Sequence, residues 1–171
     1  MVEDYQIDVQ VDEEFAGLVD EGNIIAAVAE LLRQVGKSSA ALTIAITDDA
    51  YIQQLNQEYR DVDTPTDVLS FPNQSTDSTS EATLALPPEL VAELENYLGD
   101  LVIAYPYTVA QAAHYQNSVP AEFRLLAVHG VLHLLGYDHA TPEEEAAMWA
   151  AQEAALATFG DHGLSQRAYD A

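Results

Sequence analysis

The segment "HGVLHLLGYDH", residues 129–139, carries three of the chain's five histidines among mostly apolar residues. His129 and His133 are four residues apart, so on a helix they share one face, with Cβ atoms about 5–6 Å apart. Gly136 tolerates a positive φ angle, and it can therefore end the helix and turn the chain back toward His139. This spacing predicts a metal site in which His129, His133 and His139 bind one ion.

The chain contains no cysteine, so a metal site in it must use histidine, carboxylate or water ligands. A single histidine on an apolar helix is usually a hydrogen-bonded core residue, and this is our interpretation of His114 and His162. Two buried imidazoles on one helix face need partners, because burying an unsatisfied polar group is costly. A metal ion therefore explains the cluster at 129–139 better than core packing does.

Outward from the histidines, residues 121–135 are apolar on most sides, which predicts a buried helix. Elsewhere, alternating apolar residues predict strands, and apolar residues at helical spacing predict helices. The intermixed order of these elements indicates an α+β (α/β-like) domain with about four strands. Strands are expected at 5–11, 41–47, 67–71 and 100–105, and the other helices at 23–36, 49–59, 107–116 and 142–159.

We expect residues 1–171 to form a single domain that contains the metal site, because a chain of this length can bury a sufficient core. Residues 73–98 are predicted to be a loop excursion that contains a short helix. The first part is rich in Ser and Thr, and "PPELVAELENYL" (87–98) combines proline at its start with apolar residues at helical spacing. Residues 160–171 are expected to form a frayed tail.

The chain is strongly acidic, with 29 Asp and Glu against 5 Lys and Arg and a net charge of −24 at pH 7. Such a chain repels nucleic acid at long range, because cations drive nonspecific binding to phosphates. The acidity is typical of a solvated surface, or it selects basic protein partners. The N-terminus lacks the features of a signal peptide, and no stretch approaches the ~20 apolar residues that span a membrane. We therefore expect a cytoplasmic protein.

The spacing of the three histidines around Gly136 is also that of the metzincin proteases. Those enzymes place a glutamate general base directly after the first histidine, where this chain has Gly130. Without that carboxylate the protease mechanism lacks its proton acceptor, so the sequence argues against a metalloprotease.

Four motifs in order resemble those of the YbeY family of metal-dependent endoribonucleases. They are "LNQEYR" (55–60), "DTPTDVLSFP" (63–72), "GDLVIAY" (99–105) and "HGVLHLLGYDH" (129–139). The resemblance extends over roughly residues 40–160. It implies a small four-stranded sheet, mostly parallel with an antiparallel edge strand. About five helices should pack against the sheet, among them a metzincin-like zinc-binding helix.

The resemblance also implies one zinc ion (Zn2+) on the three histidines and cleavage of single-stranded RNA. The biological roles that it implies are maturation of the 3′ end of 16S ribosomal RNA and quality control of 70S ribosomes. The expected partners are ribosomal RNA, the ribosome or small-subunit ribosomal proteins, without a membrane. Three protein ligands leave a position on zinc open for water, as in catalytic sites. Both water and the RNA 2′-hydroxyl remain open as the nucleophile.

Two residues are candidates for catalytic roles. Arg60 matches the arginine of the family's "NxxYR" pattern and is expected to grip the scissile phosphate. The alternative is a surface ion pair with Glu58 or Asp61. Asp138 is expected either to orient a histidine or water, or to cap the turn before the third ligand. Three other residues of the second motif could serve either the site or the local strand and turn, and the two roles explain them equally well: Thr66, Asp67 and Ser70.

The acidic composition departs from the basic groove that RNA-cleaving surfaces usually carry. Either the ion forms a small positive site together with Arg60 and Arg124, or access to RNA depends on a basic ribosomal protein. Affinity for free RNA is expected to be weak. Two other functions stay open: a metal-dependent hydrolase of a peptide or small phosphoester, and a non-catalytic, zinc-stabilised ribosome assembly factor.

Overall fold

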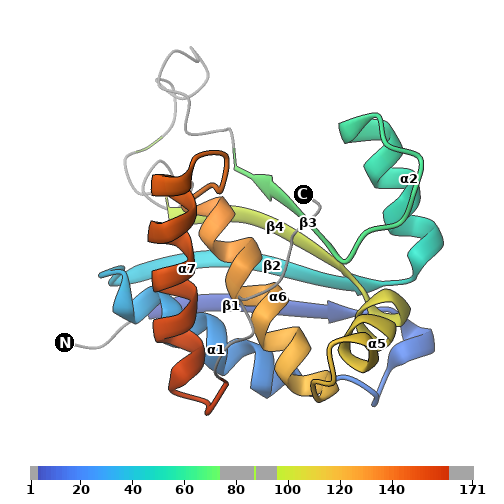
Figure 1. The fold of residues 1–171 in the computed structure, drawn as a ribbon, viewed down its shortest axis with the longest axis horizontal. Helices are drawn as coiled ribbons and strands as arrows, with labels where there is room; N and C mark the ends of the chain where they lie inside the picture. Colours follow the sequence, from blue (N-terminus) through green and yellow to red (C-terminus); the bar gives the residue numbers. More distant parts are fainter. Residues whose placement is uncertain (1–3, 74–86, 88–95, 162–171) are drawn as a thin grey trace.

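A single mixed sheet of four strands forms the centre of the computed structural model, in which residues 4–73, 87 and 96–161 are described. The strands lie in the order β1-β2-β4-β3 (Figure 1). Their bounds are Asp4–Val11 for β1, Ser39–Thr47 for β2, Val68–Pro72 for β3 and Tyr97–Ala104 for β4. β1, β2 and β4 run parallel, and β3 pairs with β4 in the antiparallel direction. The predicted mostly parallel sheet with an antiparallel edge strand is confirmed.

Helices cover both faces of the sheet, and side-chain alternation along β4 separates the two cores. Leu101 and Ile103 face the larger core, whereas Val102 and Ala104 face the smaller one, which also contains Ile52. The larger core includes α1, α6 and α7, and the smaller one includes α2. The helices are α1 (Glu21–Gln34), α2 (Asp49–Arg60), α5 (Tyr105–His114), α6 (Val119–Leu134) and α7 (Pro142–Ala157).

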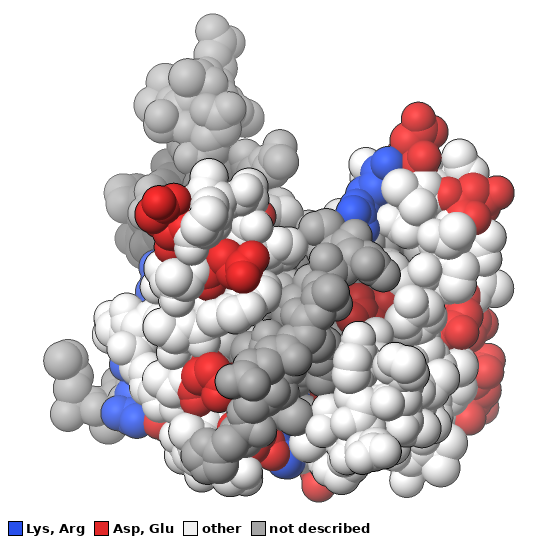
Figure 2. All heavy atoms as spheres, in the orientation of Figure 1, with Lys and Arg blue, Asp and Glu red and all other residues white. Residues whose placement is uncertain are grey.

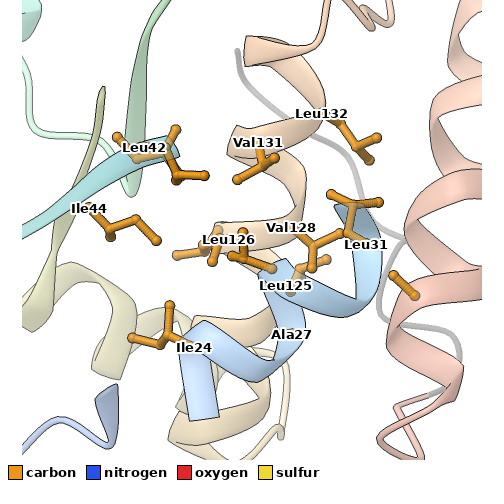
Figure 3. Packing of buried hydrophobic residues seen from close by; sticks show 14 of the residues in the cluster. Ile24, Ala27, Leu31, Leu42, Ile44, Leu125, Leu126, Val128, Val131 and Leu132 are labelled. Atoms are coloured by element: carbon orange, nitrogen blue, oxygen red, sulfur yellow. The ribbon is translucent and has the colours of Figure 1, made fainter. Parts of the chain in front are cut away.

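The helix α6 packs against the strands β3 and β4 and also contacts the helices α1 and α7 (Figure 1). It is buried on nearly every side because its sequence is apolar on nearly every side. Figure 3 shows Leu125, Val128 and Leu132 of α6 near Leu31 of α1. This packing fixes the helix on which two of the three clustered histidines lie.

Side-chain caps are present at the starts of two helices. The Asp48 carboxylate accepts a hydrogen bond from the Tyr51 N–H at 2.7 Å and begins α2. The Thr141 hydroxyl accepts one from the Glu144 N–H at 3.1 Å and begins α7. These contacts satisfy N–H groups that a helix start leaves without intrahelical partners.

The start of β4 differs from the prediction, because Tyr97 and Leu98 belong to the strand and not to a preceding helix. Gly99 makes this possible: it has a φ of 138°, and a Cβ atom there would lie 2.3 Å from the carbonyl oxygen of Phe71. Only glycine allows the two strands to approach so closely. The rest of the predicted excursion (74–86 and 88–95) and of the tail (162–171) lies outside the described residues. Among the helices that are described, none has the length and apolar character to span a membrane.

Candidate metal centre

His129, His133 and His139 come together at the C-terminal end of α6. One ring nitrogen from each lies within 4.8 Å of those of the other two. Around a tetrahedral zinc ion with Zn–N bonds of 2.0–2.1 Å, such nitrogens are about 3.4 Å apart. Small side-chain rotations therefore suffice to place all three on one ion. The three histidines that the sequence singled out are a group that could hold a metal ion.

The turn at Gly136 brings the third histidine back to the first two. Gly136 has a φ of 100° and follows the last turn of α6. Its N–H donates to the His133 carbonyl at 3.0 Å, and the Tyr137 N–H donates to the Leu132 carbonyl at 2.9 Å. This pair of bonds is the Schellman motif, which needs a left-handed residue at the position of Gly136. The glycine thus has the role that the sequence predicted for it.

Two hydrogen bonds fix which nitrogen of each ring is available to an ion. Nδ1 of His129 lies 3.0 Å from the side-chain oxygen of Gln152, and Nδ1 of His133 lies 3.1 Å from the Tyr137 carbonyl oxygen. Both partners are acceptors, so both Nδ1 atoms carry the proton and both Nε2 atoms keep a lone pair. A metal-binding histidine is commonly oriented in this way by an acceptor behind it.

Burial favours the neutral form of the imidazole, which is the form that binds a metal cation. His129 is 2% exposed, and His133 and His139 are half-buried. Burial, followed by the nearby His139, lowers the pKa of His133 below its ordinary value. The Nε2 atom of His139 is buried and forms no hydrogen bond with the described residues. Three imidazole donors with these properties match the ligand set of a catalytic zinc site.

The helix α7 supplies two side chains that sequence reasoning missed. Trp149 packs over the cluster, with ring centroids 5.5 Å from His139 and 5.9 Å from His129. Gln152 is fully buried beside His129. The signal for Gln152 was its position in an apolar stripe between Met148 and Leu156, where a buried amide needs a polar partner.

Comparisons with known proteins agree with this geometry. The model of the family described as "Endoribonuclease YbeY" matches residues 2–160. The chain belongs to the YbeY family. Its similarity to a protein of Roseiflexus castenholzii named Endoribonuclease YbeY is 45% identity over 156 residues, covering 90% of this chain and 92% of the relative.

Other YbeY relatives cover the chain to a similar extent. A Chloroflexus aggregans protein is 40% identical and covers 91% of this chain and 97% of its own length. A Lactococcus lactis protein is 37% identical, and the match covers 85% of this chain and 98% of the relative. Both are named Endoribonuclease YbeY. A Thermotoga maritima protein of known solution structure is 20% identical, with a TM-score of 0.53 and coverages of 96% and 98%, which shows a shared fold.

The YbeY motif residue Arg60 is the last residue of α2 and is exposed. Ion pairs within the described residues join Arg33 to Glu30 and Arg124 to Asp161. The alternative in which Arg60 pairs with Glu58 or Asp61 is therefore not found in this part of the chain. Its guanidinium group is available to an anion.

Arg124 does not contribute to a positive site beside the YbeY histidines. It lies toward the N-terminal end of α6, and its guanidinium group contacts the Asp161 carboxylate at 2.6 Å. That contact raises the pKa of Arg124 and balances its charge. The expectation that Arg124 joins Arg60 in a positive site is corrected accordingly, because its charge is already matched.

Asp138 is exposed, and its carboxylate accepts a hydrogen bond from the N–H of the next residue, His139, at 2.8 Å. This contact stabilises the turn that presents the third histidine. The negative charge of Asp138 also raises the pKa of His133, in opposition to burial. Asp138 thus lies close enough to the cluster to influence the protonation of His133.

The remaining candidates of the second YbeY motif support the edge strand. The Ser70 hydroxyl donates to the Gly130 carbonyl at 3.3 Å, which ties β3 to α6 beside His129. The Asp67 carboxylate accepts from Val68 N–H at 2.7 Å, and burial raises its pKa. The Thr66 hydroxyl contacts the same carboxylate at 3.3 Å.

Gly130 shows why this YbeY chain lacks the metzincin base. A Cβ atom at this position would lie 2.7 Å from a methyl carbon of Leu101 in β4. Leu101 is fully buried, so any side chain at this position would require the packed core to shift. The helix α6 approaches β4 closely at this position because glycine has no side chain.

Proposed function

We propose that this chain is a zinc-dependent endoribonuclease that cleaves single-stranded RNA. We infer that one Zn2+ ion binds His129, His133 and His139, and that the enzyme acts in 16S ribosomal RNA 3′-end maturation and 70S ribosome quality control in the cytoplasm. The observation that carries the proposal is the convergence of three imidazoles, two of them oriented by hydrogen bonds, in a chain of the endoribonuclease YbeY family.

The protein's own groups prepare the site for this chemistry. When bound, zinc supplies Lewis acidity toward a phosphoryl oxygen or lowers the pKa of water. Gln152 and the Tyr137 carbonyl hold the rings of His129 and His133 in the required orientation. The nucleophile is an activated water or the RNA 2′-hydroxyl, and Gly130 provides no carboxylate to act as its general base.

Arg60 is the residue that we assign to the scissile phosphate. Arginine can donate two parallel hydrogen bonds to phosphate oxygens and remains charged at all relevant pH values. Asp138 is assigned to orientation of the third ligand, through its hydrogen bond to the His139 N–H. Both assignments rest on position and chemistry.

The acidity of the chain bears on its partners. Acidic side chains outnumber basic ones on the face in Figure 2, in line with the net charge of −24. We infer that affinity for free RNA is weak and that small-subunit ribosomal proteins, which bear positive charge, guide the enzyme to ribosomal RNA.

Cleavage of single-stranded ribosomal RNA by the zinc-loaded protein tests the proposal, with His129→Ala as the paired variant. We expect cleavage by the wild type, none by His129→Ala, and one equivalent of zinc by elemental analysis that falls in His139→Ala. Equal cleavage by both proteins would show a contaminating nuclease and would refute the proposal.

A second candidate function is a non-catalytic ribosome assembly factor, which the acidic surface favours because it suits basic ribosomal proteins. The variant Arg60→Ala separates the two functions. An Arg60→Ala protein that stays folded, keeps its zinc and still supports normal ribosome maturation in cells would favour the assembly factor. Defective maturation with the same protein would favour the enzyme.

A further inference from the structure

The last turn of α2 presents an aromatic ring to solvent next to the candidate phosphate-binding residue. Tyr59 is 63% exposed, the largest exposure among the large hydrophobic residues of the described chain. Arg60 follows it and is also exposed. Arg60 is the basic residue in the last turn of α2. An isolated exposed tyrosine is ordinary, so the contacts of Tyr59 decide its significance.

Phe71 of the edge strand β3 fixes the orientation of Tyr59. The two ring centroids are 5.1 Å apart, and the ring planes meet at 72°. In this edge-to-face arrangement, one ring presents its edge to the other ring's face, which is a favourable aromatic geometry. Tyr59 therefore combines an ordered ring with a large solvent-exposed area. Such a ring can receive a flat ligand with little loss of side-chain freedom.

The same edge strand connects this ring to the metal centre. Ser70 contacts the Gly130 carbonyl beside His129, and the next residue, Phe71, contacts Tyr59. Adjacent residues of a strand point to opposite faces, so β3 separates the histidines from the aromatic pair. An extended nucleic acid strand that passes the edge of β3 can reach both sides.

We propose that Tyr59, held by Phe71, stacks on one base of the RNA substrate, at a nucleotide displaced from the scissile phosphate. This inference rests on the proposed ribonuclease function. Bases of single-stranded RNA are unstacked and bind aromatic side chains through their faces. Stacking does not require positive charge, so it provides binding energy that a chain with a net charge of −24 cannot obtain from phosphate contacts.

The position beside Arg60 favours RNA over a protein partner as the occupant of this surface. A guanidinium group and an aromatic ring on successive residues match the phosphate and the base of a nucleotide, respectively. An acidic surface that bound a basic protein would use its carboxylates. The lone cation of α2 would oppose such a partner.

Steady-state cleavage of a labelled single-stranded RNA by zinc-loaded protein tests the inference through three substitutions. Tyr59→Leu removes the ring, Tyr59→Phe keeps it, and Tyr51→Leu removes another exposed tyrosine of α2, one that is 51% exposed. We expect Tyr59→Leu to raise KM about 5- to 150-fold, the range of base–aromatic stacking, with a smaller change in kcat. Tyr59→Phe and Tyr51→Leu should stay within about twofold of the wild type.

A second arm uses the same RNA with a single abasic nucleotide moved along the strand. One position should raise KM for the wild type but not for Tyr59→Leu, because the variant has already lost the partner of that base. Circular dichroism and zinc content establish that each variant is folded and loaded.

The outcomes separate this inference from the proposed function. If the wild type cleaves RNA and Tyr59→Leu has the KM of Tyr51→Leu, the stacking role is wrong and the ribonuclease assignment stands. If every abasic position changes the KM of the wild type and of Tyr59→Leu equally, the stacking role is likewise wrong and the ribonuclease assignment stands. The exposed ring would then be assigned to a protein contact. An inactive wild-type protein would overturn both.

Discussion

The side-chain oxygen of Gln152 lies 3.0 Å from Nδ1 of His129, although the two residues are 23 positions apart in the chain. The contact joins α7 to α6 at the candidate metal centre and sets the tautomer of the most deeply buried of the three histidines. It makes α7 part of the candidate site, although the three clustered histidines lie outside that helix.

Replacing Gln152 with leucine should therefore weaken metal binding without removing a ligand. Loss of an acceptor behind a metal-binding histidine typically lowers metal affinity about 10- to 100-fold. The matched variant Gln152→Glu keeps an acceptor oxygen and should retain affinity. Competition with a chelator measures the change, and fluorescence of the single tryptophan, Trp149, reports it because that ring packs against His139. Identical affinities for Gln152→Leu and the wild type would contradict the role of Gln152.

The Gly136→Ala variant should lose both stability and metal affinity. A left-handed conformation costs a non-glycine residue about 1–2 kcal/mol, and the turn at Gly136 also places the carbonyl that orients His133. Gly36 provides the control, since it ends α1 with φ 86° and the same pair of hydrogen bonds. In urea unfolding, Gly36→Ala should lose similar stability yet keep metal affinity. Equal zinc binding by the two variants would show that the turn does not shape the site.

Adding a methyl group at Gly130 should destabilise the fold, because the new Cβ meets the buried side chain of Leu101. Overpacking of a core typically costs about 1–3 kcal/mol, which exceeds the gain of up to about 1 kcal/mol from a better helix former. The control Gly22→Ala lies in an exposed first turn of α1 and should be neutral or stabilising. Thermal unfolding distinguishes them, and a Gly130→Ala protein as stable as Gly22→Ala would mean that Leu101 moves aside freely.

Acid should destabilise the metal-free protein partly through His133. Burial and His139 place its pKa in the folded state below the ordinary 6.5 of an unfolded chain. Below that pH the unfolded chain binds more protons, so stability falls as pH drops from about 6.5 through the lower folded value. The loss is at most about 1.4 kcal/mol per pH unit from this group.

The comparison with His133→Gln isolates the contribution of this residue. Urea unfolding of both metal-free proteins at about pH 7.5 and about pH 5.5 should show a larger stability loss for the wild type, since glutamine does not titrate. The acidic groups are common to both proteins and cancel in the difference. An equal loss would mean that the folded protein accepts the proton on His133 without penalty.

Local pattern was sufficient for several features of this protein. Helical spacing and a glycine located the three histidines, and the alternation of apolar residues located the strands. These features depend on contacts within a few residues, so the chain encodes them locally. The start of β4 was misjudged because the close approach of Gly99 to Phe71 depends on a strand that lies far away in sequence.

The sequence by itself determined which side chains can bind a metal ion and where the chain must turn to bring them together. Only the tertiary structure decided what surrounds them: Gln152 behind His129, Leu101 against Gly130, and Phe71 beside Tyr59. Each of these pairs joins elements that are separate along the chain. Their contact depends on how helices pack on a twisted sheet, which is a property of the whole core and not of any short segment.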